Sequence, residues 1–326
     1  MAWITSTNNY SDLGLEFTAP DLILNLFDPD YGIKLSLVAP YQNTNVVQEQ
    51  TGLYVQDQIK IYDRLVLSLG GRSDQVKTTT KDLLADTVVS SDDQAFTGRA
   101  GAVYLFDNGL APYASYAQSF LPQLGTDFFG TPFKSETGEQ YEAGFKYEPP
   151  ALKNFLFTFA AFDLVRQNVL TQDPGNPLNM IQVGEIRSRG IEFEAVASLD
   201  WGLDLQAAYT HLNTEFTVNN DGTQGNTPYG VPDDRIALWA DYTFQRGRFA
   251  GFGFGAGVRY IAETWGDDAN TFKVPAVTLA DAAIHYEWDR YRLAVDEEYV
   301  ASCFAEANGC NFGQRRVVLG SLRYRW

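Results

Sequence analysis

The two histidines are the residues best suited to catalysis in this chain, but their surroundings do not predict a catalytic site. His211 and His285 are far apart in the sequence, and neither lies beside a serine, cysteine or carboxylate motif that would activate a nucleophile. His285 shares one strand face with Asp281 and Glu287, which indicates a polar wall rather than a set of metal ligands. We therefore expect no enzyme, no metal centre and no cofactor.

Two further patterns have chemical and structural interpretations. Glu192 and Glu194 are spaced like paired acid–base carboxylates, but a repeat of two residues is also what the polar face of a strand produces. Gly253, Gly255 and Gly257 form a Gly-x-Gly-x-Gly run, yet the residues after it continue a strand and open no helix that would hold a phosphate. We interpret the carboxylates as a polar strand face and the glycines as a close approach of strands.

The only cysteines, Cys303 and Cys310, lie close together near the end of the chain. A metal site would need histidines or further cysteines beside them, and the sequence has none there. We therefore predict a disulfide within a short loop, formed in an oxidising compartment.

Composition excludes several classes of protein. The net charge of −17 argues against a nucleic-acid partner, because phosphate binding needs a basic face. No run of about 18 apolar residues is present, so any membrane passage must use strands. Aromatic residues make up 14% of the chain, which favours strands over helices. The first residues contain neither a basic nor an apolar region, so we expect no signal peptide in this chain.

From residue 52 onward, polarity alternates with period two in segments of about ten to fifteen residues, which is the pattern of strands. Each segment is long enough for a tilted membrane-crossing strand, which needs roughly 9–11 residues. The predicted strands are 52–62, 65–77, 95–106, 111–120, 138–148, 154–168, 182–199, 202–216, 233–245, 250–264, 275–288, 290–298 and 313–326. Their number is odd, and a partial strand near Trp3–Ser6 would make it even.

Short and long connections alternate between these strands. Short turns include Tyr62-Asp63-Arg64 and Trp288-Asp289-Arg290. Long polar loops are predicted near 78–94, 121–137, 169–181, 217–232, 265–274 and 299–312. Such alternation is typical of outer-membrane barrels. The first of these loops contains Asp82, Asp86, Asp92 and Asp93, which we interpret as solvated; the alternative is binding of divalent cations at a lipopolysaccharide surface.

Polar and apolar side chains separate onto opposite faces of these strands. In 189–196, Ile191, Phe193 and Ala195 oppose Glu192 and Glu194. In 202–212, a face with Leu203, Leu205, Ala207 and Tyr209 opposes one with Asp204, Gln206 and Thr210. An apolar face against lipid and a polar face toward a watery interior are the arrangement of transmembrane barrels. We therefore predict an all-β fold, a transmembrane antiparallel β-barrel.

The last segment places Leu322, Tyr324 and Trp326 on one face and finishes on an aromatic residue. This ending resembles the C-terminal signal by which the assembly machinery recognises outer-membrane barrels.

Several stretches also resemble one protein family in their amino-acid sequences. They are Gln50–Gln58, Val103–Tyr113, Gly138–Gly144, Gly184–Glu192, Leu238–Phe244 and Glu298–Cys303. Together they resemble the barrel of TonB-dependent siderophore receptors, closest to the ferrichrome and ferrioxamine receptor group, over about residues 50–326. Residues 20–45 resemble the loop that precedes this part of the barrel. We accordingly assign residues 1–51 to a partial strand and a long extracellular loop, and residues 52–326 to C-terminal barrel strands.

The resemblance implies a 22-stranded barrel in the cell outer membrane, closed by an N-terminal plug. A ferric siderophore, of hydroxamate type, would be the transported ligand, and the TonB complex would act through a TonB box ahead of the plug. We find neither plug nor TonB box in residues 1–326, so the resemblance implies the C-terminal portion of such a receptor. Other implied partners are outer-membrane lipid, lipopolysaccharide and the barrel assembly machinery.

The resemblance also suggests ligand contacts. Phe304, directly after Cys303, matches a family position that contributes an aromatic side chain to the hydroxamate site; the alternative is a loop aromatic packed on its neighbours. Phe27, Tyr31 and Tyr41 in the first loop are weaker candidates. The sequence departs from the family where an Asn-Asn-Leu-Phe element is missing before Asp296, which predicts a short hairpin at 290–300.

Two other functions fit the same strands. One is a smaller passive pore that closes by itself, and the other is a non-functional product of a truncated receptor gene.

Overall fold

The computed structural model describes the backbone of residues 2–13, 40–173, 176–298, 303–306, 309–312 and 317–324. All regular structure within these residues is β-strand. None of this part forms a helix that is long and apolar enough to cross a membrane.

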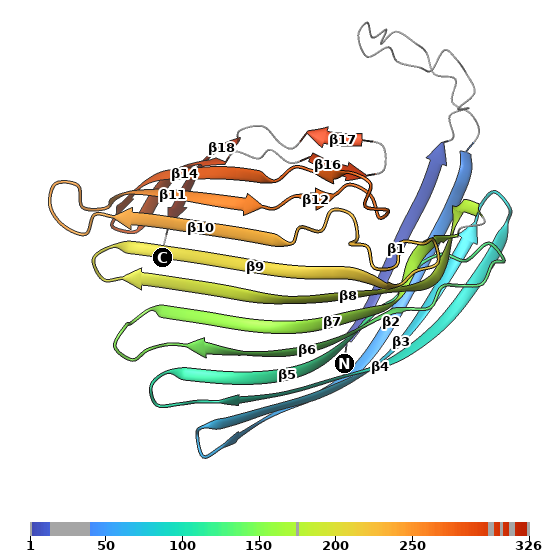
Figure 1. Cartoon of the computed structure of the whole chain (residues 1–326), viewed down its shortest axis with the longest axis horizontal. Coiled ribbons are helices and arrows are strands. Elements are labelled where there is room, and N and C mark those ends of the chain that lie inside the picture. The colour runs from blue at the N-terminus through green and yellow to red at the C-terminus, as the bar shows by residue number, and fades with distance from the viewer. Residues whose placement is uncertain are drawn as a thin grey trace, which may run out of the picture. The chain divides into compact units, whose positions relative to one another are not determined.

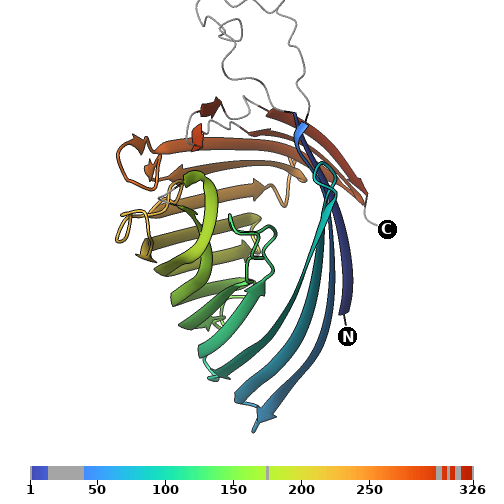
Figure 2. The ribbon, with the colours of Figure 1, turned by 90° about the vertical axis from the view of Figure 1, so that its right-hand side faces the viewer.

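Fourteen strands lie in one sheet, and their order in the sheet is their order in the chain. They are β1 (Ala2–Leu13), β2 (Pro40–Ile61), β3 (Leu65–Asp82), β4 (Thr87–Tyr104), β5 (Leu110–Leu121), β6 (Glu136–Tyr147), β7 (Phe155–Asp173), β8 (Asn176–Leu199), β9 (Leu203–Val218), β10 (Asp234–Thr243), β11 (Phe252–Ile261), β14 (Val277–Trp288), β15 (Tyr291–Glu298) and β18 (Val317–Tyr324). Neighbours from β4 to β18 pair antiparallel, as do β1 and β2. Figures 1 and 2 show β5 to β11 side by side in this order.

Two short antiparallel pairs lie outside the large sheet. β12 (Thr264–Trp265) pairs with β13 (Lys273–Val274), and β16 (Cys303–Glu306) pairs with β17 (Gly309–Phe312). Both pairs lie in connections that the sequence predicted as long loops.

The chain divides into two compact units. The first contains Met1–Val55, Arg72–Phe96 and Pro122–Ser135, and the second contains Gln56–Gly71, Thr97–Leu121 and Glu136–Trp326.

The predicted strands are confirmed, and β1 covers the partial strand expected near Trp3–Ser6. Five boundaries were wrong. β2 begins at Pro40 rather than at residue 52. The predicted loops 78–94 and 169–181 are mostly strand, because β3 ends at Asp82 and β4 begins at Thr87, and because β7 ends at Asp173 and β8 begins at Asn176. The apolar alternation that identified the strands marks the part that faces lipid. Polar extensions beyond it stay paired, because the ladder of backbone hydrogen bonds does not need an apolar face.

The short turns follow hairpin rules. Tyr62 and Asp63 both have positive φ, 48° and 56°, and the amide of Arg64 donates a 3.1 Å hydrogen bond to the carbonyl of Ile61. This is the arrangement of a type I′ turn, whose twist matches that of the strands it joins. The hairpin of β14 and β15 is equally regular, with Trp288 opposite Tyr291 and no shift of register as far as Asp281 and Glu298.

The two faces of β7 to β10 confirm the predicted alternation. One face, the aromatic face, carries Phe159, Phe193 and Tyr209 in a row across three strands. The ring centroids of Phe159 and Phe193 are 4.9 Å apart, and those of Phe193 and Tyr209 are 6.0 Å apart. The opposite face carries Glu192 and Glu194. Leu238, on the aromatic face of β10, keeps 48% of its surface exposed, as expected of a side chain that contacts lipid.

Candidate ligand-binding face

Loop 122–135 belongs to the first unit and is fixed to β4 at one end. The backbone N–H of Ser135 donates a 2.8 Å hydrogen bond to the Asp93 carboxylate, and the Ser135 hydroxyl binds the same oxygen. Within the loop, Asp127 Oδ1 accepts hydrogen bonds from the N–H groups of Phe129, at 2.9 Å, and Thr131, at 2.8 Å. An Asp that binds the backbone ahead of it is a common way to set a turn. The loop is therefore held by its own sequence as well as by β4.

A cavity of about 530 Å³ lies between this loop and strands β2, β3 and β4. Its lining residues are Thr44 and Val46 on β2, Thr80 and Asp82 on β3, Thr87 and Val89 on β4, and Leu124, Gly125 and Thr126 in the loop. The residues on each strand are two positions apart, so all six lie on one face of their strands. The same face of β3 continues into Thr78, Val76 and Asp74, which are buried.

Below the cavity, Arg72 and Asp74 form an ion pair on this face of β3. Arg72 Nε lies 2.5 Å from Asp74 Oδ2, and Gln50 Nε2 donates to Asp74 Oδ1 at 2.8 Å. Asp74 is only 4% exposed, and every charge buried in this way needs such partners. A side chain at Gly52 would collide with Arg72, which explains the glycine.

In the second unit, the glycine run of β11 makes room for large neighbouring side chains. A side chain at Gly253 would collide with the His285 ring, and one at Gly255 or Gly257 would collide with the Trp239 indole. This explains the Gly-x-Gly-x-Gly run more directly than the predicted close approach of strands. No phosphate loop is formed there, because β11 runs through all three glycines.

His285 is buried beside the glycine run of β11. Its side chain is fully buried, Nε2 lies 3.0 Å from the Thr243 hydroxyl, and Nδ1 lies 3.5 Å from Asp241 Oδ2. His211 lies instead on the aromatic face, with Nδ1 2.9 Å from Asp234 Oδ1. Within the described residues neither histidine is hydrogen-bonded to a serine or a cysteine, and no three His, Cys, Asp or Glu side chains are arranged to hold a metal ion.

Two outer loops of the second unit, 219–233 and 262–276, are joined by reciprocal hydrogen bonds. Asn270 Oδ1 accepts from the Thr227 N–H at 3.0 Å, and Asn270 Nδ2 donates to the Thr227 carbonyl at 2.8 Å. Asp268 Oδ1 accepts from the Tyr229 N–H at 2.9 Å, and burial raises the pKa of the Asp268 carboxyl. The loops thus form one unit, which we call the paired loops.

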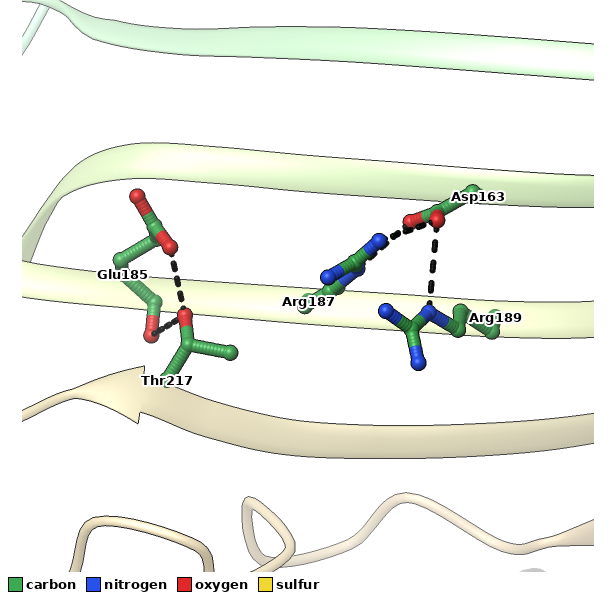
Figure 3. Close-up of polar contacts among 5 residues, drawn as sticks. All are labelled: Asp163, Glu185, Arg187, Arg189 and Thr217. Carbon is green, nitrogen blue, oxygen red and sulfur yellow. Dashed lines mark hydrogen bonds and ion pairs between the residues drawn. The ribbon is translucent and has the colours of Figure 1, made fainter.

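The aromatic face of the second unit ends in a charged patch (Figure 3). Along β8, the row of Ala195, Phe193 and Ile191 is followed on the same face by Arg189 and Arg187. Arg187 donates two hydrogen bonds to Asp163, of 2.8 and 2.5 Å, and Arg189 donates one of 3.3 Å. Such a change from apolar to charged residues is expected where a strand leaves hydrocarbon for the headgroup region.

Thr217 and Glu185 extend this patch, since the Thr217 hydroxyl donates a 2.7 Å hydrogen bond to Glu185 Oε1 (Figure 3).

The structure describes only some of the residues that the sequence predicted as ligand contacts. Phe304 lies in β16 opposite Asn311 of β17, and Tyr41 lies in β2. Phe27 and Tyr31 lie outside the described residues, as do Trp326 and the side chains of Phe304 and Tyr41. Leu322 and Tyr324 of the predicted assembly signal are exposed on β18.

The register of β16 and β17 places Cys303 opposite Phe312 and Cys310 opposite Ala305, so the two cysteines are diagonal neighbours and their disulfide stays a prediction.

Sequence reasoning missed the cavity of the first unit entirely. Its strand residues Thr80, Asp82 and Thr87 fall in the segment that was predicted as a loop. The alternation of Thr78, Thr80 and Asp82 was the available signal, because it continues the inward positions of β3.

Together, the antiparallel meander, the apolar outer surface and the polar inner wall define the wall of an outer-membrane β-barrel. The family model described as TonB dependent receptor-like, beta-barrel matches residues 3–296, and the chain belongs to this family. The family and its relatives are outer-membrane proteins, which confirms the predicted location.

Two relatives confirm the resemblance to the ferrichrome and ferrioxamine group. The ferrichrome outer membrane transporter/phage receptor of Escherichia coli K12 is 39% identical over 323 residues, covering 93% of this chain and 42% of that protein. The ferrioxamine B receptor of Salmonella typhimurium SL1344 is 34% identical over 313 residues, covering 92% of this chain and 44% of that protein. The chain thus spans less than half the length of either relative.

Solved structures show the same fold. The ferric-catecholate import receptor Fiu of E. coli K12 matches with a TM-score of 0.74 and 20% identity, over 99% of this chain and 50% of that one. The siderophore receptor PiuA of Acinetobacter baumannii matches with a TM-score of 0.72 and 23% identity, over 89% of this chain and 44% of that one.

Proposed function

We propose that this chain forms part of an outer-membrane receptor for a ferric siderophore of the hydroxamate type. One observation carries the proposal: relatives named for ferrichrome and for ferrioxamine B both match more than nine-tenths of the chain. Both of these ligands are ferric hydroxamates. Their iron is already coordinated by the siderophore, so a receptor for them needs pockets for organic surface rather than metal ligands of its own.

In this proposal the strands supply barrel wall, and the outer loops meet the ligand. Phe304, Phe27, Tyr31 and Tyr41 are candidate aromatic contacts, since a ring packs well on the alkyl and amide parts of a hydroxamate complex. Energy for uptake would come from the TonB complex, acting through a plug segment that we do not find in residues 1–326.

The apolar side chains of the aromatic face indicate which membrane components the chain would contact. Lipid would cover the row that includes Phe159, Phe193 and Leu238, because Leu238 is exposed and the two phenylalanines are only half-buried. The charged patch of Asp163, Arg187 and Arg189 would then lie at the headgroups of the outer leaflet, where lipopolysaccharide carries its phosphates. Leu322, Tyr324 and Trp326 would serve recognition by the barrel assembly machinery.

Equilibrium binding tests the proposal. The complete gene product containing this chain, purified in detergent, is titrated with ferric ferrichrome, ferric ferrioxamine B and a ferric tris-catecholate, and tryptophan fluorescence reports binding. We expect saturable binding of at least one hydroxamate and weaker binding of the tris-catecholate. Failure of both hydroxamates to bind contradicts the proposal. Conductance without binding, measured in planar bilayers, would favour a passive pore.

A further inference from the structure

We propose that the cavity beneath loop 122–135 is a subsite for a ferric hydroxamate, and that Asp82 selects complexes carrying an ammonium group. This inference rests on the function proposed above and specifies where on the inner wall part of the ligand sits. All the residues that carry it belong to the first unit.

The cavity is lined by side chains of two kinds. Thr44, Thr80, Thr87 and Thr126 bring hydroxyl groups, and none of these hydroxyls has a hydrogen-bond partner among the described residues. Val46, Val89 and Leu124 supply aliphatic surface. Hydroxyls donate to the carbonyl oxygens of amides and hydroxamates, and aliphatic side chains pack against the methylene spacers between them.

The negative charge in the cavity lining restricts which ligands can bind. Asp82 is the one charged residue in the lining, and no cation accompanies it there. Asp82 Oδ1 accepts hydrogen bonds from the N–H groups of Leu84, at 2.8 Å, and Ala85, at 3.0 Å. Its other oxygen has no partner among the described residues. The neighbouring cation, Lys81, lies on the other strand face and approaches Asp86 at 3.9 Å instead.

An uncompensated carboxylate in a partly enclosed space attracts cations and repels anions. A ferric tris-catecholate carries several negative charges and would be disfavoured there. A neutral ferric hydroxamate would be tolerated, and one with a free amine would gain an ion pair with Asp82.

Loop 122–135, which forms one side of the cavity, is pre-organised. Gly125 has φ of +100°, and its carbonyl accepts a 3.1 Å hydrogen bond from the Phe133 N–H. Thr126 pairs with Pro132 in an isolated bridge, and Ser135 is tied to Asp93. Because this loop is already ordered, little conformational entropy is lost when a ligand enters. The volume of about 530 Å³ is within the usual range for ligand sites, roughly 300–1,000 Å³.

The test uses two probes that differ in one charge. Ferric ferrioxamine B carries a free amine, and its N-acetyl derivative is neutral but otherwise the same. Dissociation constants are measured for both with the complete gene product and with Asp82→Asn. The asparagine oxygen still accepts from Leu84 and Ala85, so the turn is retained. Asp86→Asn is the matched control, since Asp86 belongs to the same hairpin but does not line the cavity.

We expect Asp82→Asn to weaken binding of the amine probe by about 10- to 150-fold, the range of a charge-assisted contact, and to leave the acetylated probe unchanged. Thr80→Val combined with Thr126→Val should weaken both probes by about 2- to 10-fold. The subsite is refuted if Asp82→Asn matches Asp86→Asn with the amine probe, or if it weakens both probes equally. Failure of the unaltered protein to bind either probe refutes the subsite, and the proposed function is overturned with it only if ferrichrome also fails to bind.

Discussion

The indole of Trp239 on β10 occupies the space above Gly255 on β11, and the carboxylate of Asp241 lies beside it. A methyl group at Gly255 would overlap the indole and come within 2.7 Å of Asp241 Oδ2. The alternate glycines of β11 are therefore a packing requirement of the inner wall.

Gly255→Ala should destabilise the protein by about 1–3 kcal/mol, because the wall must move to admit the methyl group. Unfolding by urea in lipid vesicles measures the loss. Gly320→Ala is the matched control: Gly320 also lies in a strand, β18, but the space around it is open. Equal stability of the two variants would contradict the packing account.

The orientation of β9 predicts unequal costs for arginine at adjacent positions. Ala207 lies on the aromatic face, opposite Ala195 and Leu238, whereas Gln206 lies on the other face. Ala207→Arg should cost about 2–4 kcal/mol near the middle of the bilayer, while Gln206→Arg should have little effect. Folding titrations of the complete gene product in lipid would separate them. Equal penalties would contradict the assignment of one face to lipid, and a larger penalty at Gln206 would show that the two faces have been assigned the wrong way round.

Asn270 should control the docking of the paired loops. Asn270→Ala removes both hydrogen bonds to Thr227, which we expect to lower protection of loop 219–233 from hydrogen exchange by about 5- to 100-fold. Gln224→Ala is a suitable control, because within the described residues the Gln224 side chain bonds only to the Thr217 carbonyl next to its own loop. Unchanged protection in Asn270→Ala would mean that other contacts hold the loops together.

The same loops should respond to pH through Asp268. Burial raises the pKa of this carboxyl in the docked loops, so the docked state binds the proton more tightly than the undocked state. The resulting stabilisation is complete below the ordinary carboxyl pKa, about 3.9, and is lost as pH rises through the raised value. Protection of the loops, corrected for intrinsic exchange, should thus fall from mildly acidic to neutral pH, and Asp268→Asn should remove this dependence.

Cys303 and Cys310 should form an intramolecular disulfide. They lie on neighbouring strands, two register positions apart, and are the only cysteines in the sequence. Mass spectrometry of membrane-isolated, non-reduced protein should find the cross-linked peptide. Two alkylatable thiols in that material would contradict the prediction.

Sequence reasoning found the strands because lipid-facing positions alternate with inward ones, and that alternation is local in the chain. It also predicted that Phe193 and Glu192 lie on opposite faces of β8 and that Ala207 and Gln206 lie on opposite faces of β9, and the register of these strands confirms this separation. It missed residues 78–82 of β3 and 87–94 of β4, where most side chains on both faces are polar.

The cavity could not be predicted in the same way. Thr44, Thr80 and Thr87 come together through the pairing of three strands, and Thr126 joins them through the fold of a loop. Relative register across strands and the path of a loop depend on contacts between distant residues. The role of Gly255 was likewise hidden, because the side chain that needs its space belongs to another strand.

In the proposed function, this chain is one part of an energised receptor whose transport would need a plug acting through TonB. The most direct test is uptake of a radiolabelled ferric hydroxamate by cells that lack their own receptors. One strain makes the complete gene product, and a second makes only residues 1–326 behind a signal peptide. We predict saturable uptake in the first strain that disappears when the TonB system is deleted, and none in the second. Saturable, TonB-dependent uptake by residues 1–326 alone would contradict the account.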